Sequence, residues 1–105
     1  MIRHCVFIRF KPETSRERIA ELFGEIDALK DHLEGIQAVH VGANVSPETG
    51  MDKDYSNGFI VDFDNAQSRD RYLEDSKHQS TGAKLVEAAL NGLEGILVYD
   101  LEIPD

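Results

Sequence analysis

The sequence predicts an α+β fold, with a four-stranded antiparallel sheet that carries helices on one face. Runs rich in β-branched and aromatic residues alternate with amphipathic segments, in the order strand, helix, strand, strand, helix, helix, strand. Hydrophobic residues make up 41% of the chain and charged residues 30%, which is ordinary for a globular protein. The length of 105 residues suits one domain, so we assign residues 1–105 to a single domain.

Residues 2–10 are expected to form the first strand, because they are rich in β-branched and aromatic residues and end before Pro12. His4 falls on the more apolar face of this strand, the face expected to meet the helices. The segment 14–17 fits a capping box with Thr14 as the cap. The helix that follows has one apolar stripe, formed by Ile19, Leu22, Phe23, Ile26, Leu29 and Leu33.

The remaining elements follow from the same patterns. Residues 36–45 and 57–63 are the next two strands, joined by a polar loop over residues 46–56. A second helix, capped by Asp64 or Asn65, is expected to end near Asp75. A third helix is expected from about Thr81 to Leu93, before a last strand over residues 94–102 that is apolar on both faces at its centre.

This order is the split βαβ, or ferredoxin-like, arrangement, whose sheet has one face without helices. Val39, Val41, Val45 and Phe7 are expected on that face, which is then too apolar to be left in water. The simplest partner is a second copy related by a two-fold axis, and the alternative is a monomer whose loop covers the face. Cys5 is expected on this face, and His40 on the same side as His4.

Charge and composition argue against several classes of function. The net charge of −9 disfavours nucleic acid and anionic membranes as partners. A single cysteine excludes an intrachain disulfide. No secretory signal or apolar segment of about 20 residues occurs, so a cytoplasmic location is expected. Disorder is expected only at residues 103–105.

Five segments, at residues 4–11, 42–46, 55–59, 72–78 and 97–101, together resemble a known family, the stress-responsive dimeric α/β-barrel (Dabb) family. Residues 4–11 (HCVFIRFK) resemble its opening H-x-x-x-x-x-F-K segment. Residues 42–46 and 55–59 resemble its G-x-[ND]-x-[ST] and Y-[TS]-[HN]-x-[FI] segments. Residues 72–78 match Y-x-x-H-P-x-H at the first and last positions, and residues 97–101 resemble the closing V-x-D-[YL] strand. The resemblance implies a dimeric α/β barrel, hence a homodimer.

The resemblance also implies a site between the sheet and the helices. In the polyketide cyclases of this family, the Tyr and last His of Y-x-x-H-P-x-H are the catalytic pair, which assigns Tyr72 and His78 as candidate catalytic residues. His4, Asn57 and Phe59 are the candidate substrate-binding residues. The sequence departs from the family pattern at Asp75-Ser76, where H-P is usual, and at Asn57, where cyclases carry a histidine.

The residue types allow both a chemical and a structural interpretation of these positions. A neutral histidine beside a tyrosine hydroxyl can support enolisation or aldol chemistry. Alternatively, His4 is a core histidine bonded to a neighbour such as Tyr72, while His78 lies on an exposed loop. No metal-ligand spacing or phosphate-binding loop occurs, so we expect no metal and no organic cofactor. Some relatives hold a cation on main-chain carbonyls, at positions that align with Lys30, Leu33 and Ile36.

Three functions therefore remain open. The first is a stress-responsive dimer that binds a small molecule between sheet and helices. The second is a small-molecule lyase or polyketide-cyclase-like enzyme that uses the Tyr/His pair. The third is a barrel oxygenase or dehydratase domain, against which the absence of tryptophan argues.

Overall fold

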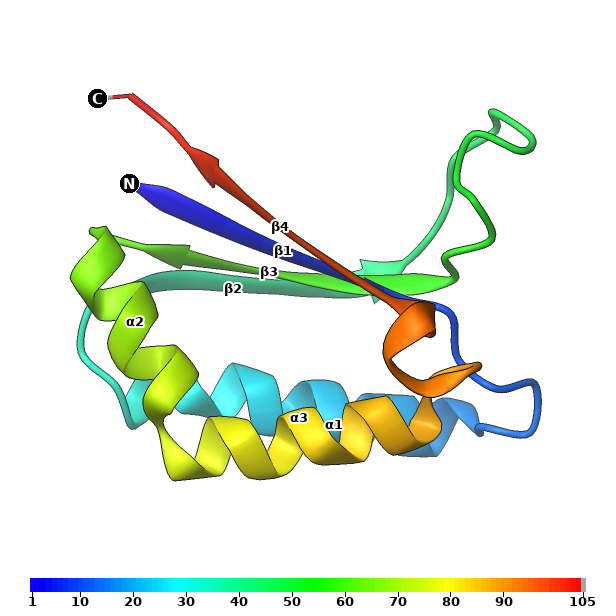
Figure 1. Cartoon of the computed structure of the whole chain (residues 1–105), viewed down its shortest axis with the longest axis horizontal. Coiled ribbons are helices and arrows are strands. Elements are labelled where there is room, and N and C mark those ends of the chain that lie inside the picture. Colours follow the sequence, from blue (N-terminus) through cyan, green and yellow to red (C-terminus); the bar gives the residue numbers. More distant parts are fainter. Residues whose placement is uncertain (105) are drawn as a thin grey trace.

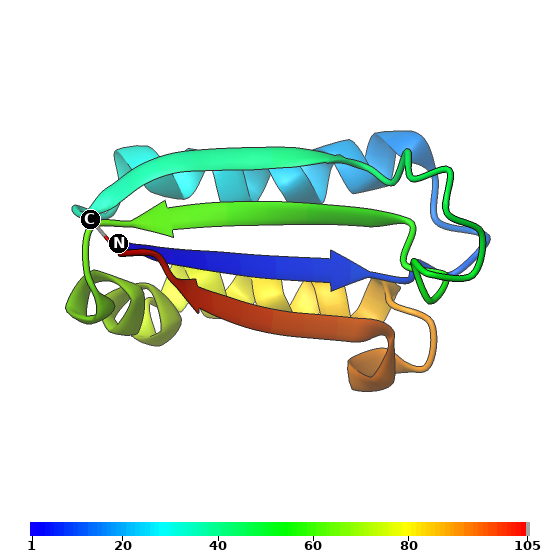
Figure 2. The ribbon, with the colours of Figure 1, turned by 90° about the horizontal axis from the view of Figure 1, so that it is seen from above.

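The predicted order of elements and the ferredoxin-like fold are confirmed by a computed structural model, which describes residues 1–104. Four strands form one antiparallel sheet in the order β2-β3-β1-β4, and the helices lie on one face (Figures 1 and 2). The elements are β1 (Ile2–Ile8), α1 (Arg16–Ala28), η1 (Leu29–Asp31), β2 (Ile36–Ala43), β3 (Asn57–Phe63), α2 (Ala66–Glu74), α3 (Ser76–Ala88), η2 (Gly92–Gly95) and β4 (Ile96–Glu102).

The core lies between the sheet and the helices. Strand register places His4 opposite Val61 and Val6 opposite Phe59, all on the helix-covered face. α1 contributes its apolar stripe, and the long helices α1 and α3 run side by side beneath the sheet (Figures 1 and 2). The buried cluster consists of Ile2, Val6, Ile8, Leu22, Phe23, Ile26, Leu29, Phe59, Val61, Phe63, Tyr72, Leu85 and Ala89.

Several predicted boundaries are wrong by a few residues. The cap of α1 is Ser15, whose hydroxyl accepts the Arg18 N–H at 3.0 Å, and not Thr14. β1 ends at Ile8 and β2 at Ala43, two residues earlier than expected in each case. α3 begins at Ser76, well before the expected Thr81, because Asp75 caps it there. The first turn of α3 carries few apolar residues, so the apolar pattern did not reveal this start. Of the two predicted caps of α2, Asp64 and Asn65, the structure has Asn65.

The predicted assignment of β2 to the sheet faces is wrong. Val39 pairs with Val61 and Val41 with Phe59, so both valines lie on the helix side. His40 pairs with Ile60 on the other face, the side opposite to His4. Val45 lies beyond the end of β2. Alternation separates the two faces of a strand, but it does not say which one the helices cover.

The face without helices, called here the open face, is apolar as expected, but the valines of β2 do not make it so. Its apolar residues come mainly from β1, β3 and β4 and are Cys5, Phe7, Ile60, Leu97, Tyr99 and Leu101. Leu97, Tyr99 and Leu101 are 41%, 58% and 44% exposed. The 44–56 loop stands at one end of this face and does not lie across it (Figures 1 and 2), so the loop is not its cover.

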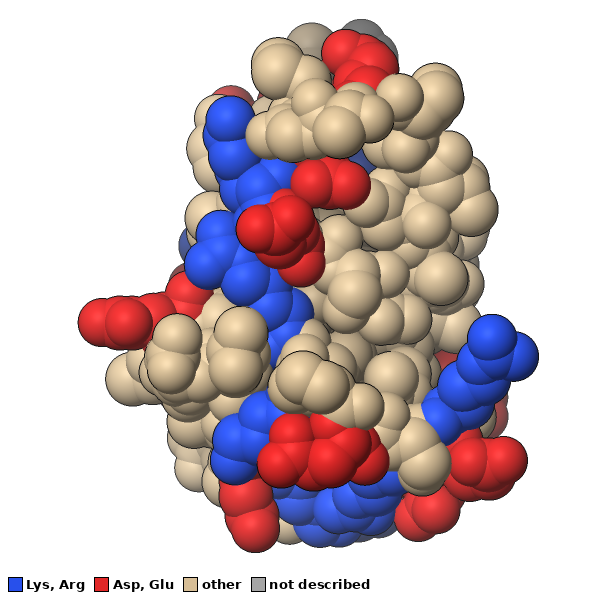
Figure 3. Space-filling view, turned by 90° about the vertical axis from the view of Figure 1, so that its right-hand side faces the viewer, with Lys and Arg blue, Asp and Glu red and all other residues tan. Residues whose placement is uncertain are grey.

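The surface otherwise carries charges of both signs. On the end of the molecule seen in Figure 3, acidic and basic side chains are interleaved beside an uncharged area. Within residues 1–104, none of the helices has the length and apolar character needed to cross a membrane. The chain ends meet, because Met1 and Ile103 exchange backbone hydrogen bonds at 3.0 and 2.9 Å. Of the expected disordered residues 103–105, Asp105 lies outside the described part.

Candidate functional site

Three of the predicted site residues meet beneath the sheet. The ring of Tyr72 lies 4.0 Å from that of His78 and 5.6 Å from that of His4, measured between centroids. His4 is 3% exposed and Tyr72 is fully buried. Phe63 packs against both His4 and Tyr72, at 6.3 and 5.1 Å, and forms an apolar wall. We call His4, Tyr72 and His78 the buried polar cluster.

The junction between α2 and α3 places Tyr72 beside His78. Tyr72 lies near the end of α2 and His78 in the first turn of α3, not beyond a helix as the sequence suggested. One carboxylate oxygen of Asp75 accepts the backbone N–H groups of Lys77 and His78, at 3.0 Å each. The other lies 2.9 Å from Nε2 of His32, which ties the junction to the end of η1. The departure from H-P at Asp75 thus supplies a helix cap.

Two polar atoms of the cluster are buried without hydrogen-bond partners. Neither the Tyr72 hydroxyl nor Nδ1 of His78 has a partner within residues 1–104. Burial raises the pKa of Tyr72, so its hydroxyl keeps its proton. Burial, together with the nearby His4, lowers the pKa of His78 and outweighs the opposing effects of the Leu73 backbone and the Asp75 carboxylate, which favours the neutral imidazole. The cluster therefore presents a neutral ring nitrogen and a protonated phenol side by side.

His4 is held by a carboxylate that the site prediction did not include. Its Nδ1 lies 2.6 Å from Oδ1 of Asp100 on β4, and Oδ2 of Asp100 accepts a hydrogen bond of 2.7 Å from Arg69 on α2. Burial alone would raise the pKa of Asp100, but the bonds from His4 and Arg69 outweigh it and lower the pKa. The only feature of the sequence that pointed to Asp100 was its place in the V-x-D segment of the family pattern.

Asn57 and Phe59 do not join this cluster. Both lie on the helix-facing side of β3, but Asn57 pairs with Ile8, at the far end of β1 from His4. Four residues along β3 separate Asn57 from Val61, which pairs with His4, or about 13 Å of strand. Phe59 packs its ring at 5.6 Å against Phe23 of α1. Phe59 is therefore a core residue, and Asn57 lies at the end of the sheet opposite to the buried polar cluster.

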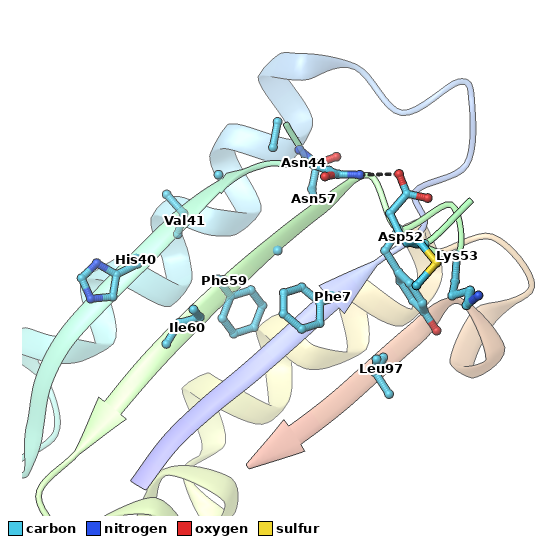
Figure 4. Close-up of a pocket in the computed structure, with 15 residues that line it drawn as sticks. Phe7, His40, Val41, Asn44, Asp52, Lys53, Asn57, Phe59, Ile60 and Leu97 are labelled. Carbon is cyan, nitrogen blue, oxygen red and sulfur yellow. Dashed lines mark hydrogen bonds between the residues drawn. The ribbon is translucent and has the colours of Figure 1, made fainter. Parts of the chain in front are cut away.

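The open cavities also lie away from the cluster. One, of about 480 Å³, lies on the open face beside the 44–56 loop, where Asn44 donates a hydrogen bond of 2.7 Å to Asp52 (Figure 4). A second, of about 530 Å³, follows the groove between α1 and β2, and a third, of about 260 Å³, lies between α1 and α3. None of these three is lined by His4, Tyr72 or His78.

Fold and site together define a small ferredoxin-like α+β protein with a closed polar cluster beneath its sheet. The family model described as "Stress responsive A/B Barrel Domain" (Dabb) matches residues 2–103. The chain therefore belongs to the Dabb family. Comparison with curated proteins finds no significant match.

Solved structures support the same fold. A protein from Jannaschia sp. CCS1, described as dimeric, ferredoxin-like and of unknown function, is 32% identical with a TM-score of 0.90, over 97% of this chain and 98% of that one. An Arabidopsis thaliana protein is 23% identical with a TM-score of 0.87, over 100% and 97%. A hydroxynitrile lyase from Passiflora edulis is 16% identical with a TM-score of 0.83, over 99% and 94%.

Proposed function

We propose that the protein is a homodimer that binds a small organic molecule at the buried polar cluster of His4, Tyr72 and His78. The unpartnered Tyr72 hydroxyl and His78 Nδ1 are the observation that carries this proposal. Leaving a buried polar group unpaired costs about 1–3 kcal/mol, so two such atoms in ring contact need an explanation. A ligand with one hydrogen-bond donor and one acceptor would satisfy both.

Ligand entry requires movement, because Tyr72 is fully buried. The bridge from Arg69 of α2 to Asp100 of β4 is about a quarter exposed at each side chain and leads directly to His4. Because both side chains are partly exposed, this bridge lies at the edge of the core, where an opening would reach solvent first. We therefore place the route to the cluster between α2 and β4.

Lyase or cyclase chemistry is the second candidate, and it is favoured by the protonation states. A neutral His78 can remove a proton, and a protonated Tyr72 can donate a hydrogen bond to a carbonyl or developing oxyanion. The Passiflora edulis protein, described as a hydroxynitrile lyase, shares the fold at 16% identity. It therefore suggests a class of reaction to test, but no substrate. Release of cyanide from simple cyanohydrins is one assay, and ring closure of a polyketide analogue is another.

The variant Tyr72→Phe tests the binding proposal. It removes the unpaired hydroxyl and keeps the ring, so the ligand-free protein should be at least as stable as wild type in urea unfolding. Small molecules that co-purify with the wild-type protein, identified by mass spectrometry of the denatured sample, should be lost or strongly reduced in this variant. The matched control is Tyr99→Phe, because Tyr99 is exposed on the open face, away from the cluster.

Two outcomes would count against the binding proposal. One is a Tyr72→Phe protein that is clearly less stable than wild type, which would mean that the hydroxyl has a structural partner. The other is a ligand that both proteins retain equally. The homodimer is tested separately by sedimentation at micromolar concentration, which should give about twice the chain mass of 11.8 kDa.

A further inference from the structure

One residue at the junction between α2 and α3 is hydrogen-bonded to both halves of the Tyr72–His78 pair. The backbone N–H of Asp75 donates to the carbonyl oxygen of Tyr72 at 3.2 Å. The side-chain carboxylate of Asp75 accepts the backbone N–H of His78 at 3.0 Å. Asp75 therefore lies midway along the chain between two residues whose ring centroids are 4.0 Å apart, and it bonds to the backbone of each.

The position of Tyr72 is fixed by contacts that do not involve this junction. Ser68 lies one helical turn before Tyr72 on α2, and both side chains are buried. The Ser68 hydroxyl donates a hydrogen bond of 2.5 Å to Asp64, and it fits so closely against Gly35 that a Cβ on Gly35 would collide with it. Tyr72 also packs its ring against Phe63. The geometry of the pair is therefore decided by where the chain places His78.

His78 lies in the first turn of α3, where the backbone N–H groups have no partner within the helix. The Asp75 carboxylate accepts two of these groups, those of Lys77 and His78, at 3.0 Å each. Without this acceptor the first turn would fray, and the His78 ring would no longer be directed at Tyr72. The aim of the ring thus depends on Asp75.

Two side-chain contacts with the preceding helices hold α3 on either side of His78. On one side, Oδ1 of Asp75 lies 2.9 Å from Nε2 of His32, at the end of η1. On the other side, the buried hydroxyl of Thr81 donates a hydrogen bond of 2.7 Å to Glu25 of α1. The Thr81 contact lies beyond the first turn of α3, so the His32 contact is the one that anchors the turn containing His78.

From these contacts we propose that Asp75, anchored by His32, is a positioning residue that holds the ring of His78 against Tyr72 in the arrangement that binds the ligand. This role rests on the proposed function, which takes the buried polar cluster as the ligand site. Asp75 itself touches neither ring contact surface, and it acts through the backbone of His78. The change from the family's H-P to Asp75-Ser76 thereby provides this chain with a specific means of building the site.

The carboxylate of Asp75 has a second effect on His78, which separates position from charge. Burial and His4 lower the pKa of His78, while the Leu73 backbone and the Asp75 carboxylate raise it. Burial is the largest of these effects. Release of the ring from the core therefore raises the pKa of His78, whereas removal of the carboxylate charge with the ring in place lowers it further.

Nuclear magnetic resonance of the ligand-free protein tests the positioning role. The readouts are the pKa of His78, assigned with the His78→Gln variant, and the nuclear Overhauser effect between the rings of His78 and Tyr72. In Asp75→Ala the Overhauser effect should be lost, and the pKa of His78 should rise toward the ordinary value of histidine. In Asp75→Asn the Overhauser effect should persist, because Asn caps a helix about as well as Asp, and the pKa of His78 should fall below that of the wild type.

Two further variants provide a control and a second test. Ser15→Ala removes the cap of α1, away from the cluster, so it should destabilise the protein and leave both readouts of His78 unchanged. His32→Ala keeps the cap of α3 and removes its anchor, so it should change both readouts in the same direction as Asp75→Ala but by less. If Asp75→Ala is too unstable to titrate, His32→Ala decides the test.

The outcomes that overturn the positioning role are distinct from those that overturn ligand binding. Unchanged readouts in Asp75→Ala would mean that Asp75 is a stabilising cap and nothing more, and they would leave the binding proposal standing. A rise of the His78 pKa in Asp75→Asn equal to that in Asp75→Ala would show that a cap of the same shape does not hold the ring. Absence of any ligand from the wild-type protein would reject the proposed function, while the geometry of His78 is still decided by the titration.

Discussion

At the residue scale, two histidines of the cluster differ in their surroundings. His4 bonds to Asp100, which Arg69 also holds, so its Nδ1 position is fixed. His78 has an unpartnered Nδ1 within the described residues, and burial lowers its pKa. Two side chains of the same type can take different chemical roles when their surroundings differ in this way. Under the proposed function, we therefore assign His78 the role of base or acceptor and His4 the role of orienting the ligand.

The lowered pKa of His78 predicts an acid-sensitive fold. Below the unfolded pKa of about 6.5, the unfolded chain protonates this histidine while the folded chain does not. The stabilising contribution is therefore complete above this pH and declines as the pH falls toward the folded pKa, by at most about 1.4 kcal/mol per pH unit. In thermal unfolding from pH 7 to pH 5, the loss of Tm should be smaller in His78→Gln than in wild type.

The control for this prediction is His40→Gln, because His40 is largely exposed on the open face and its contact with Asp62 is a long one of 3.6 Å to a carboxylate that Arg3 already holds. This variant should show the same acid-induced loss of Tm as the wild-type protein. If His78→Gln and wild type lose Tm equally, another group causes the acid sensitivity.

At the element scale, the helix starts depend on single capping side chains. Ser15, Asn65 and Asp75 each accept a backbone N–H in the first turn of their helix. The sequence identified Asn65 as a possible cap but selected Thr14 in place of Ser15, because both residues fit a cap followed by a polar turn. For α3 the polar first turn concealed the start, so the expected helix began too late and His78 was placed outside it.

The cap of α1 gives a prediction with its own control. Ser15→Ala should reduce the free energy of unfolding by about 0.5–2 kcal/mol, because the Arg18 N–H loses its acceptor. Thr14→Ala should change it by less than about 0.5 kcal/mol, since Thr14 is not the cap. Urea unfolding of both variants measures the difference. A larger loss for Thr14→Ala would mean that the capping box begins there after all.

At the scale of the whole molecule, the open face is the dominant feature that no segment of residues 1–104 covers. A small domain gains only a modest stability from its own core, so covering this face would add substantially to it. If dimerisation is coupled to folding, the Tm depends on concentration by mass action. The Tm should rise between about 1 and 100 μM wild-type protein. A Tm of the wild type that is independent of concentration would contradict the coupling.

The sequence by itself determined the order of elements, the ferredoxin-like fold and the family, because periodicity and turn residues are local signals. It also selected Tyr72, His78 and His4, which the fold brings together. Tertiary structure alone decided which face of β2 the helices cover, and it separated Asn57 from the cluster. It also revealed Asp100 and Arg69 beside His4. These facts depend on strand register and on contacts between distant segments, which the alternation of residues along a strand does not specify.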